Sequence, residues 1–174
     1  MKLLVLLLLL VAAAYFVPAP LGHVEQSVDI ATGRERVWSV LGDVTSARLW
    51  DPTMKDLKLV SDIRVGPGAE LFAPGTLVKT RETVKDWVPY NRIVFDVTHD
   101  PNITRYETST LTIEPGDRSE TTRVKWALDY QMAGGYLGHW ADQFLLGTVH
   151  AGRVKDGLAN LKRFTETGET PITL

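Results

Sequence analysis

Few side chains in this 174-residue sequence are placed to carry acid–base chemistry. His99 continues the alternating face of the segment 93–97, so strand periodicity predicts that it points into the protein or into the mouth of a cavity. A neutral imidazole there could hydrogen-bond a ligand carbonyl or transfer a proton; the alternative is a partly exposed histidine at a strand end. Glu107 shares the inward parity of the strand that follows it unless a bulge intervenes, and Tyr106 and Tyr130 could each supply a hydroxyl.

The residues that other catalytic or metal-binding chemistries require are missing from the sequence. The sequence has no cysteine, which excludes disulfides, thiolate catalysis and cysteine-based zinc sites. His139 has helical spacing to Asp142 and Gln143, but no second ligand cluster completes a metal site. The sequence lacks a nucleophile elbow, a phosphate loop and a dinucleotide fingerprint, and its net charge of -2 gives no basic field for nucleic acid. We therefore predict no metal, no cofactor and no nucleic-acid partner.

The elements that must position these groups begin with an alternating strand at 23–30. Thr32 and Glu35 then have the spacing of a capping box before an apolar helical stripe, and a shorter helical turn follows at 45–49. Six further strands are expected at 55–62, 69–72, 76–88, 93–100, 106–114 and 122–132. The pattern becomes helical again from about 136 to 166.

This order of elements predicts an α+β fold. Consecutive strands joined by short turns form an antiparallel sheet, here curved and of about seven strands. Two short helices follow the first strand, and the long C-terminal helix buries its apolar stripe across the concave face of the sheet. Arginine and lysine side chains on the helices are expected on solvated faces; they are Arg34, Arg36, Arg153, Lys155, Lys162 and Arg163.

Three glycines interrupt the expected C-terminal helix, at Gly147, Gly152 and Gly157. Each mid-helix glycine is unfavourable by about 1 kcal/mol relative to alanine, so each requires a reason. One interpretation is a pocket, because bulky residues stand at both ends of the sheet-facing stripe and small residues, including Ala151, stand between them. The other is a close approach of the helix to a large sheet residue such as Trp126.

A pocket here would be lined mainly by aromatic side chains, with few polar groups. Alternation points Phe95, Trp126 and Tyr130 inward, the helix contributes Trp140 and Phe144, and further aromatic residues would close the ends of the pocket. The candidate ligand-binding residues are Trp50, Phe72, Trp87, Phe95, His99, Tyr106, Trp126, Tyr130, Trp140, Phe144, Gly147 and Ala151.

The N-terminal segment 1–22 carries an unbroken apolar run at 3–17. As a helix this run spans about 22 Å, less than the roughly 30 Å of a hydrocarbon core, so it is either a short membrane anchor or a cleaved signal peptide. Lys2 precedes the run and no Lys or Arg follows it until Arg34, which places the remainder outside the cytoplasm. We expect an anchored domain, with a secreted domain as the alternative.

The stretches "VEQSVDIATGRERVWSVLGDV", "WDP", "GTLVKT", "VPYNRIVFDV" and "TTRVKWALDY" resemble the START-like or helix-grip superfamily, and more narrowly its SRPBCC and polyketide cyclase/dehydrase-like group. The resemblance covers about 23–166, within a predicted domain at 23–168 that a tail at 169–174 follows. It implies a deep apolar cavity between sheet and C-terminal helix that holds lipids, polyketides, hormones or other hydrophobic molecules.

These observations predict a protein that binds a hydrophobic small molecule or lipid without covalent chemistry. The segments 73–75 and 100–105 and the C-terminal helix would open the cavity. An alternative is a cyclase or dehydratase-type enzyme that uses His99 and a tyrosine as acid and base, for which titratable groups must converge in the cavity. A third is a ligand-free interaction domain of the cell envelope, whose core would be filled. The sequence leaves the oligomeric state open.

Overall fold

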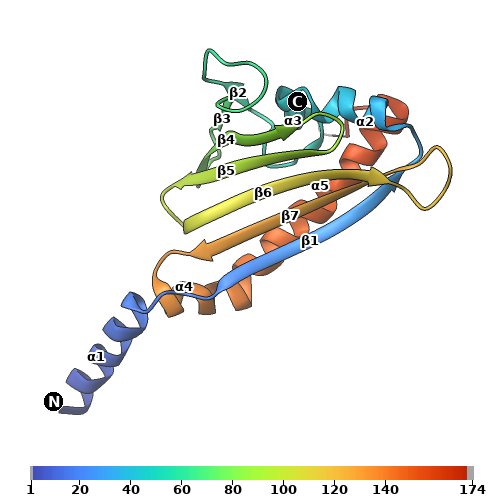
Figure 1. The fold of residues 1–174 in the computed structure, drawn as a ribbon. Helices are drawn as coiled ribbons and strands as arrows, with labels where there is room; N and C mark the ends of the chain where they lie inside the picture. Colours follow the sequence, from blue (N-terminus) through green and yellow to red (C-terminus); the bar gives the residue numbers. More distant parts are fainter. Residues whose placement is uncertain (1, 172–174) are drawn as a thin grey trace.

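The computed structural model describes residues 2–171 (Figure 1). The side chains of residues 145 and 146 are outside this description, and so are residues 172–174 of the predicted tail. The order of the elements is the predicted one, so the α+β helix-grip fold is confirmed.

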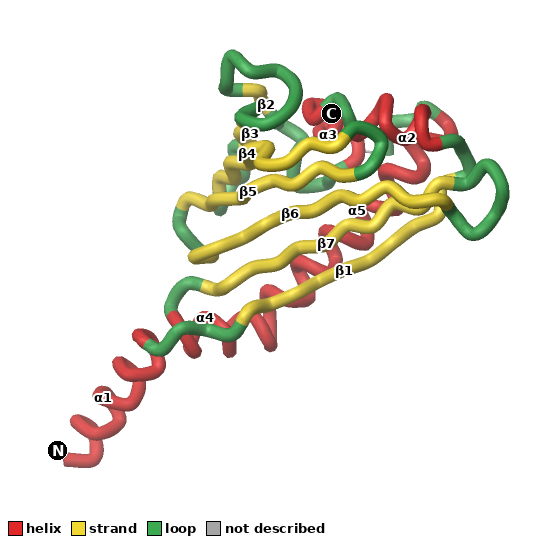
Figure 2. Tube along the Cα trace, viewed as in Figure 1, coloured by secondary structure: helices red, strands yellow, loops and turns green. Residues whose placement is uncertain are grey.

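One antiparallel sheet of seven strands, in the order β1-β7-β6-β5-β4-β3-β2, forms the scaffold (Figure 2). The strands are β1 (Leu21–Ile30), β2 (Lys58–Leu59), β3 (Glu70–Ala73), β4 (Lys79–Val88), β5 (Arg92–Asp100), β6 (Thr104–Pro115) and β7 (Thr122–Met132). In β7 every second residue from Val124 to Met132 is buried, as the alternation predicts. The inner face of the sheet and one face of the helices therefore form a single core.

The short helices after β1 are α2 (Arg34–Leu41), the 3₁₀ turn η1 (Val44–Ser46) and α3 (Ala47–Trp50). The predicted capping box is wrong, because α2 begins after Gly33, which adopts extended backbone and provides no side-chain cap. Thr32 therefore lies one position too early to cap the helix, and its carbonyl instead accepts a hydrogen bond from the hydroxyl of Thr122.

The C-terminal helical region runs through α4 (Gly135–Ala141), the π-helical segment η2 (Asp142–Leu146) and α5 (Gly147–Thr167), and α5 crosses one face of the sheet (Figure 1). A π-helical turn adds a residue to the helical repeat, so side chains on its two sides do not share one regular stripe. Asp142 is consequently buried, while Trp140 and Phe144 are 61% and 72% exposed. The prediction that Trp140 and Phe144 face the sheet is wrong for this reason.

The three glycines differ in their surroundings. A side chain at Gly157 would collide with the ring of Trp126, so the close-approach interpretation holds there. Gly152 faces open space, and Gly147 lies where η2 meets α5. Beside Trp126 the core leaves only about 20 Å³. The middle of the helix is thus packed on the sheet, and the glycines do not create a hollow there.

The apolar N-terminal segment forms α1 (Lys2–Phe16), which projects from the end of the sheet where α4 lies (Figure 1). Across residues 2–171, no helix combines the length and the apolar character that a membrane span requires. α1 meets α4 through backbone, because Gly135 lies against the carbonyls of Ala14, Tyr15 and Val17. Gln131 donates a hydrogen bond to the carbonyl of Ala19 at 2.6 Å and fixes the connection to β1.

Candidate ligand-binding cavity

A cavity of about 580 Å³ opens between the first turns of α5, the ends of β4, β5 and β6, and the loop between β3 and β4. The connection between β5 and β6, which contributes Ile103 to the lining, lies at the end of the sheet from which α1 projects (Figure 1). The lining of the cavity consists of Pro52, Thr53, Lys55, Asp56, Ala73, Pro74, Gly75, Thr76, Leu77, Val78, Thr80, His99, Ile103, Glu107, Val149, His150 and Arg153. The cavity therefore has an apolar mouth and a floor of titratable groups.

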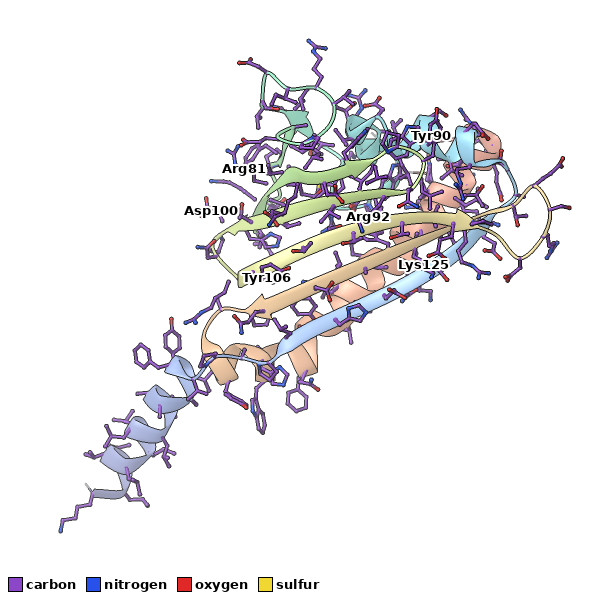
Figure 3. All side chains as sticks on the ribbon, viewed as in Figure 1. Arg81, Tyr90, Arg92, Asp100, Tyr106 and Lys125 are labelled. Carbon is purple, nitrogen blue, oxygen red and sulfur yellow. The ribbon has the colours of Figure 1, made fainter. Side chains whose placement is uncertain are left out.

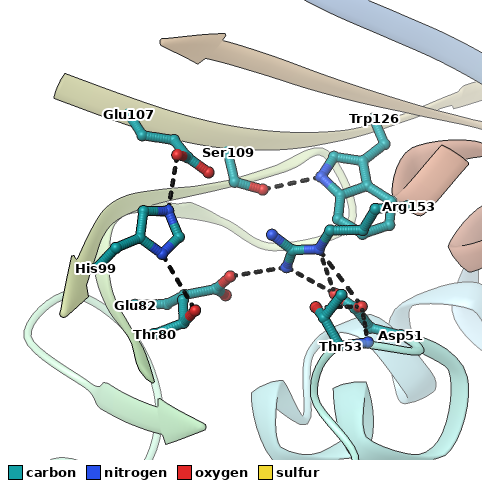
Figure 4. A network of polar contacts seen from close by, with 9 residues as sticks. All are labelled: Asp51, Thr53, Thr80, Glu82, His99, Glu107, Ser109, Trp126 and Arg153. Carbon is teal, nitrogen blue, oxygen red and sulfur yellow. Dashed lines mark hydrogen bonds and ion pairs between the residues drawn. The ribbon is translucent and has the colours of Figure 1, made fainter. Parts of the chain in front are cut away.

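His99 and Glu107 form the first polar cluster of this floor (Figure 4). His99 Nε2 and Glu107 Oε2 are 2.8 Å apart, and the two side chains are only 7% and 1% exposed. His99 Nδ1 lies 3.2 Å from the hydroxyl of Thr80 on the neighbouring strand. The bulge in β6 falls between Thr104 and Tyr106, ahead of Glu107, so the predicted inward parity of Glu107 is confirmed.

The charge of Glu107 depends on its histidine partner. Burial disfavours the ionised carboxyl, but the hydrogen bond and charge of His99, followed by Arg153, outweigh burial and lower the pKa of Glu107. Glu107 is thus a carboxylate that holds the imidazole by a charge-assisted hydrogen bond. Both ring nitrogens of His99 are engaged, which fixes the ring orientation.

Arg153 joins α5 to the other side of the cavity through two buried carboxylates (Figure 4). Its Nη2 lies 2.7 Å from Asp51 Oδ2 and 3.0 Å from Glu82 Oε1. The guanidinium also stacks over Trp126, 5.3 Å from the ring centroid. The prediction that Arg153 lies on a solvated face is wrong: its side chain is 10% exposed, because these partners replace the water that burial removes.

Burial also sets the proton affinity of this cluster. Desolvation raises the pKa of Glu82, since the attraction of Arg153 only partly offsets burial and the nearby charge of Asp51 adds to it. Asp51 Oδ1 accepts a further hydrogen bond from the backbone amide of Thr53 at 2.9 Å, which holds the turn after α3. The arginine is therefore fixed between two rigid elements.

A third polar cluster reaches the cavity through His150, which is part of the lining. Tyr130 donates its hydroxyl to Asp142 at 3.0 Å, and the ring of His150 packs edge-on against Tyr130 with centroids 4.5 Å apart. Burial and the carboxylate of Asp142 raise the pKa of Tyr130, so its hydroxyl stays protonated and engaged. Burial lowers the pKa of His150, and its Nδ1 has no hydrogen-bond partner among the described residues.

The predicted site residues fall into different environments. Of the twelve, only His99 lines this cavity. Four others point inward as expected and are buried in the core, namely Trp50, Phe95, Trp126 and Tyr130. Gly147 and Ala151 are half-buried, but they are not part of the lining.

The remaining predicted aromatic residues are not part of the lining of this cavity. Tyr106 is 47% exposed on the open face of the sheet, which it shares with Arg92 and Lys125 (Figure 3). Phe72 lies under the guanidinium of Arg81, and Trp87 packs edge-on against Trp38 at 5.0 Å. Phe72 lies on the outer face because its neighbours in β3 are the buried ones, whereas the bulge between Val84 and Asp86 places Trp87 opposite the buried Ile93, where it packs against the core and not against the cavity.

Sequence reasoning missed Arg153 and its two carboxylate partners, together with Thr80 and His150. A signal existed for β4, where Thr80, Glu82 and Val84 share one parity, so a carboxylate is placed on an inward face. The turn at Asp51 and the helical position of Arg153 carry no comparable local pattern. Their pairing is a property of the tertiary structure.

Comparison with known proteins agrees with this fold. The family model "Polyketide cyclase / dehydrase and lipid transport" matches residues 22–166. No curated protein sequence matches this chain. An uncharacterised protein from Bacillus thuringiensis is 22% identical with a TM-score of 0.66, over 83% of this chain and 98% of that chain.

Two enzymes share the fold at lower identity. A truncated norcoclaurine synthase from Thalictrum flavum is 11% identical with a TM-score of 0.66, over 88% of this chain and 98% of that chain. The Zhui aromatase/cyclase from Streptomyces sp. R1128 is 16% identical with a TM-score of 0.62, over 86% of this chain and 98% of that chain. These likenesses establish the architecture, and the match of the family model over most of the sequence establishes the membership: this chain belongs to the polyketide cyclase/dehydrase and lipid transport family.

Proposed function

We propose that this protein binds a hydrophobic small molecule or lipid, with one uncharged polar group, in the cavity between α5 and the ends of β4, β5 and β6. The observation that carries the proposal is the cavity itself, whose volume of about 580 Å³ lies within the usual size of small-molecule sites. A cavity of this size favours a ligand-binding protein over a ligand-free interaction domain. The family description, which includes lipid transport, supports the same class of ligand.

The mouth of the cavity supplies the apolar contacts. Leu77 and Val149 line it and are 88% and 61% exposed, which is high for large aliphatic side chains. A ligand that covers them removes apolar surface from water, a gain of about 25 cal/mol per Å². The apolar body of the ligand therefore lies between the loop after β3 and the first turns of α5.

The floor selects the polar group. The guanidinium of Arg153 is already paired with the buried Asp51 and Glu82, and Glu107 adds a buried carboxylate to the lining. The exposed Lys55 and Asp56 at the rim offset each other, so an anionic ligand at the floor would add to a surplus of negative charge. A hydroxyl or carbonyl, in contrast, can exchange hydrogen bonds with Thr80 or His99 without a charge penalty. We infer a neutral ligand such as a long-chain alcohol or ketone.

Native mass spectrometry of the full chain, purified from its own host, tests this function. The expected result is a bound mass that is released when the protein unfolds and that belongs to a neutral, largely apolar compound. In competition, a long-chain alcohol should displace it better than the fatty acid of equal length. A protein that takes up neither compound contradicts the proposal.

Acid–base catalysis is the second candidate, because titratable groups do converge in the cavity. Thr80, His99 and Glu107 form a continuous hydroxyl–imidazole–carboxylate chain. The predicted tyrosine is not part of it, since Tyr106 lies outside and Tyr130 is held by Asp142. Binding remains the first candidate because a substrate must displace Thr80 before His99 has a free nitrogen.

Proton exchange distinguishes the two candidates. An enzyme of this kind would exchange the α-protons of a bound ketone for deuterium, and NMR would follow the reaction. His99→Gln should abolish the exchange and preserve binding of the ketone. Binding without exchange in the wild-type protein would exclude the catalytic candidate.

We further propose that α1 holds the domain at a membrane. Leu3 to Leu10 are all more than half exposed, so the apolar part of α1 that precedes its contact with α4 is not covered by the described residues. The charge distribution around the segment 3–17 supports a domain outside the cytoplasm, and this localisation stays a prediction.

A further inference from the structure

We propose that the exposed face of α4 and η2 is a second membrane contact, which rests in the headgroup region of a lipid bilayer beside α1. This face, the aromatic face, consists of Tyr136, Leu137, Trp140 and Phe144. The proposal rests on the placement of α1 at a membrane, and it is independent of what the cavity binds.

The aromatic face is too apolar for an ordinary solvent-facing helix. Its four residues are 42%, 41%, 61% and 72% exposed in chain order. The rings of Trp140 and Phe144 lie 6.0 Å apart and form part of a groove of about 340 Å³. Such contiguous exposed rings mark an interaction site rather than scattered surface residues.

Charge is missing from the same surface. From Ala133 to Gly152 the sequence contains no lysine or arginine, and its one acidic residue, Asp142, is buried against Tyr130. A helix at a protein–water boundary normally carries charged residues on its outer side. The described side chains of this segment instead present uncharged groups and His139 outward, and such a surface does not require contact with water.

The position of α4 identifies a bilayer as the partner. α4 begins at Gly135, whose backbone packs against the last turn of α1 at Ala14 and Tyr15. When α1 enters hydrocarbon, its last turn and α4 therefore lie at the level where the chain leaves it (Figure 1). Tryptophan and tyrosine are the residues that membrane proteins place at that level. One apolar phase then covers both α1 and the aromatic face.

This arrangement also brings the mouth of the cavity toward the bilayer. Val149 lies one turn beyond Phe144 and lines the cavity mouth. With the aromatic face on the bilayer, the mouth is close to the lipid surface. A hydrophobic ligand could then pass between bilayer and cavity with little exposure to water.

Single-cysteine labelling of the full chain tests the proposal, since the sequence contains no cysteine of its own. The variants Phe144→Cys, Val5→Cys and Ser119→Cys each carry an environment-sensitive fluorophore and are reconstituted into phosphatidylcholine vesicles. Position 5 reports on α1, and position 119, exposed in the loop between β6 and β7, is the control. Quenching is measured with a spin-labelled phosphatidylcholine and with aqueous iodide.

The expected result is that lipid-borne quencher acts severalfold more strongly at positions 144 and 5 than at 119, and that iodide shows the reverse order. Added salt should not change this, because the face has no basic residues. Trp140→Asp should remove the lipid quenching at position 144, whereas Val60→Asp, at an exposed site elsewhere, should not.

Each other outcome overturns the inference in a recognisable way. If position 5 is quenched by lipid and position 144 behaves like 119, the aromatic face is not a membrane contact although α1 is. If neither is quenched, the membrane part of the proposed function fails as well. If position 144 is shielded from both quenchers, the face is covered by protein, such as a second copy, and not by lipid.

Discussion

The two halves of α5 meet the sheet in different ways. In the C-terminal half, Leu158 and Leu161 are at most 3% exposed, and Gly157 lies directly on Trp126. In the N-terminal half, Arg153 and His150 face a cavity of about 580 Å³ and reach the sheet through polar groups. The same helix is therefore close-packed at one end and separated from the strands at the other.

The difference shows what keeps a cavity open in this fold. Small residues bring the helix closer, as Gly157 does, and so remove space rather than create it. The separated half is instead supported by Arg153, whose long side chain needs carboxylates on other elements. Dismantling either type of contact should reveal its contribution to the free energy of unfolding.

Removal of Arg153 should have the largest effect. Arg153→Met leaves Asp51 and Glu82 buried without a cation, and breaking a buried pair in this way destabilises by about 3–5 kcal/mol. Urea unfolding followed by circular dichroism measures the change. The triple variant with Asp51→Asn and Glu82→Gln should recover most of the loss, because no unpaired charge then remains. Equal instability of the single and triple variants would contradict this explanation.

Gly157→Val should have the next largest effect. A β-carbon at this position meets the ring of Trp126, which is 2% exposed and held by a hydrogen bond to Ser109 at 2.9 Å. Overpacking of this kind lowers the free energy of unfolding by about 1–3 kcal/mol. Chemical denaturation of wild type and variant gives the difference. A neutral result would mean that the contact with Trp126 is not tight.

Gly152→Ala is the matched control on the same helix. Apart from its own helix backbone and chain neighbours, no described atom lies within 4 Å of a β-carbon at this position, so the main change is in helix propensity. We expect a gain of up to about 1 kcal/mol in the free energy of unfolding, of opposite sign to Gly157→Val. A loss of stability would show that the helix needs glycine at this position for another reason.

The smallest effect at neutral pH belongs to His150. Because burial lowers its pKa below the ordinary 6.5, the folded protein binds this proton less readily than the unfolded chain. Its contribution to stability is thus complete above about 6.5 and is lost as the pH falls through the lower folded-state pKa. In a pH series of thermal unfolding, His150→Gln should weaken this acid dependence. If the pH dependence of the unfolding temperature is the same in wild type and His150→Gln, another titratable group causes the acid dependence.

Local patterns predicted the fold and part of the site. Strand parity identified Trp126, Tyr130 and Glu107 as inward residues, because it needs only the neighbouring positions of the same strand. Arg153 could not be predicted in this way, since Glu82 and Asp51 are 71 and 102 residues away in sequence. The π-helical segment was equally hidden, and it moved Trp140 and Phe144 from the predicted interior to the surface.

The most direct test maps where a hydrophobic ligand lies in the full chain. A long-chain alcohol that carries a diazirine is bound, photolysed and located by peptide mass spectrometry. The account predicts labels on the residues of the cavity mouth, Leu77, Ile103 and Val149, and their loss in Val149→Trp but not in Val60→Trp. Labels confined to α1 and the aromatic face, with none in the cavity, would contradict it.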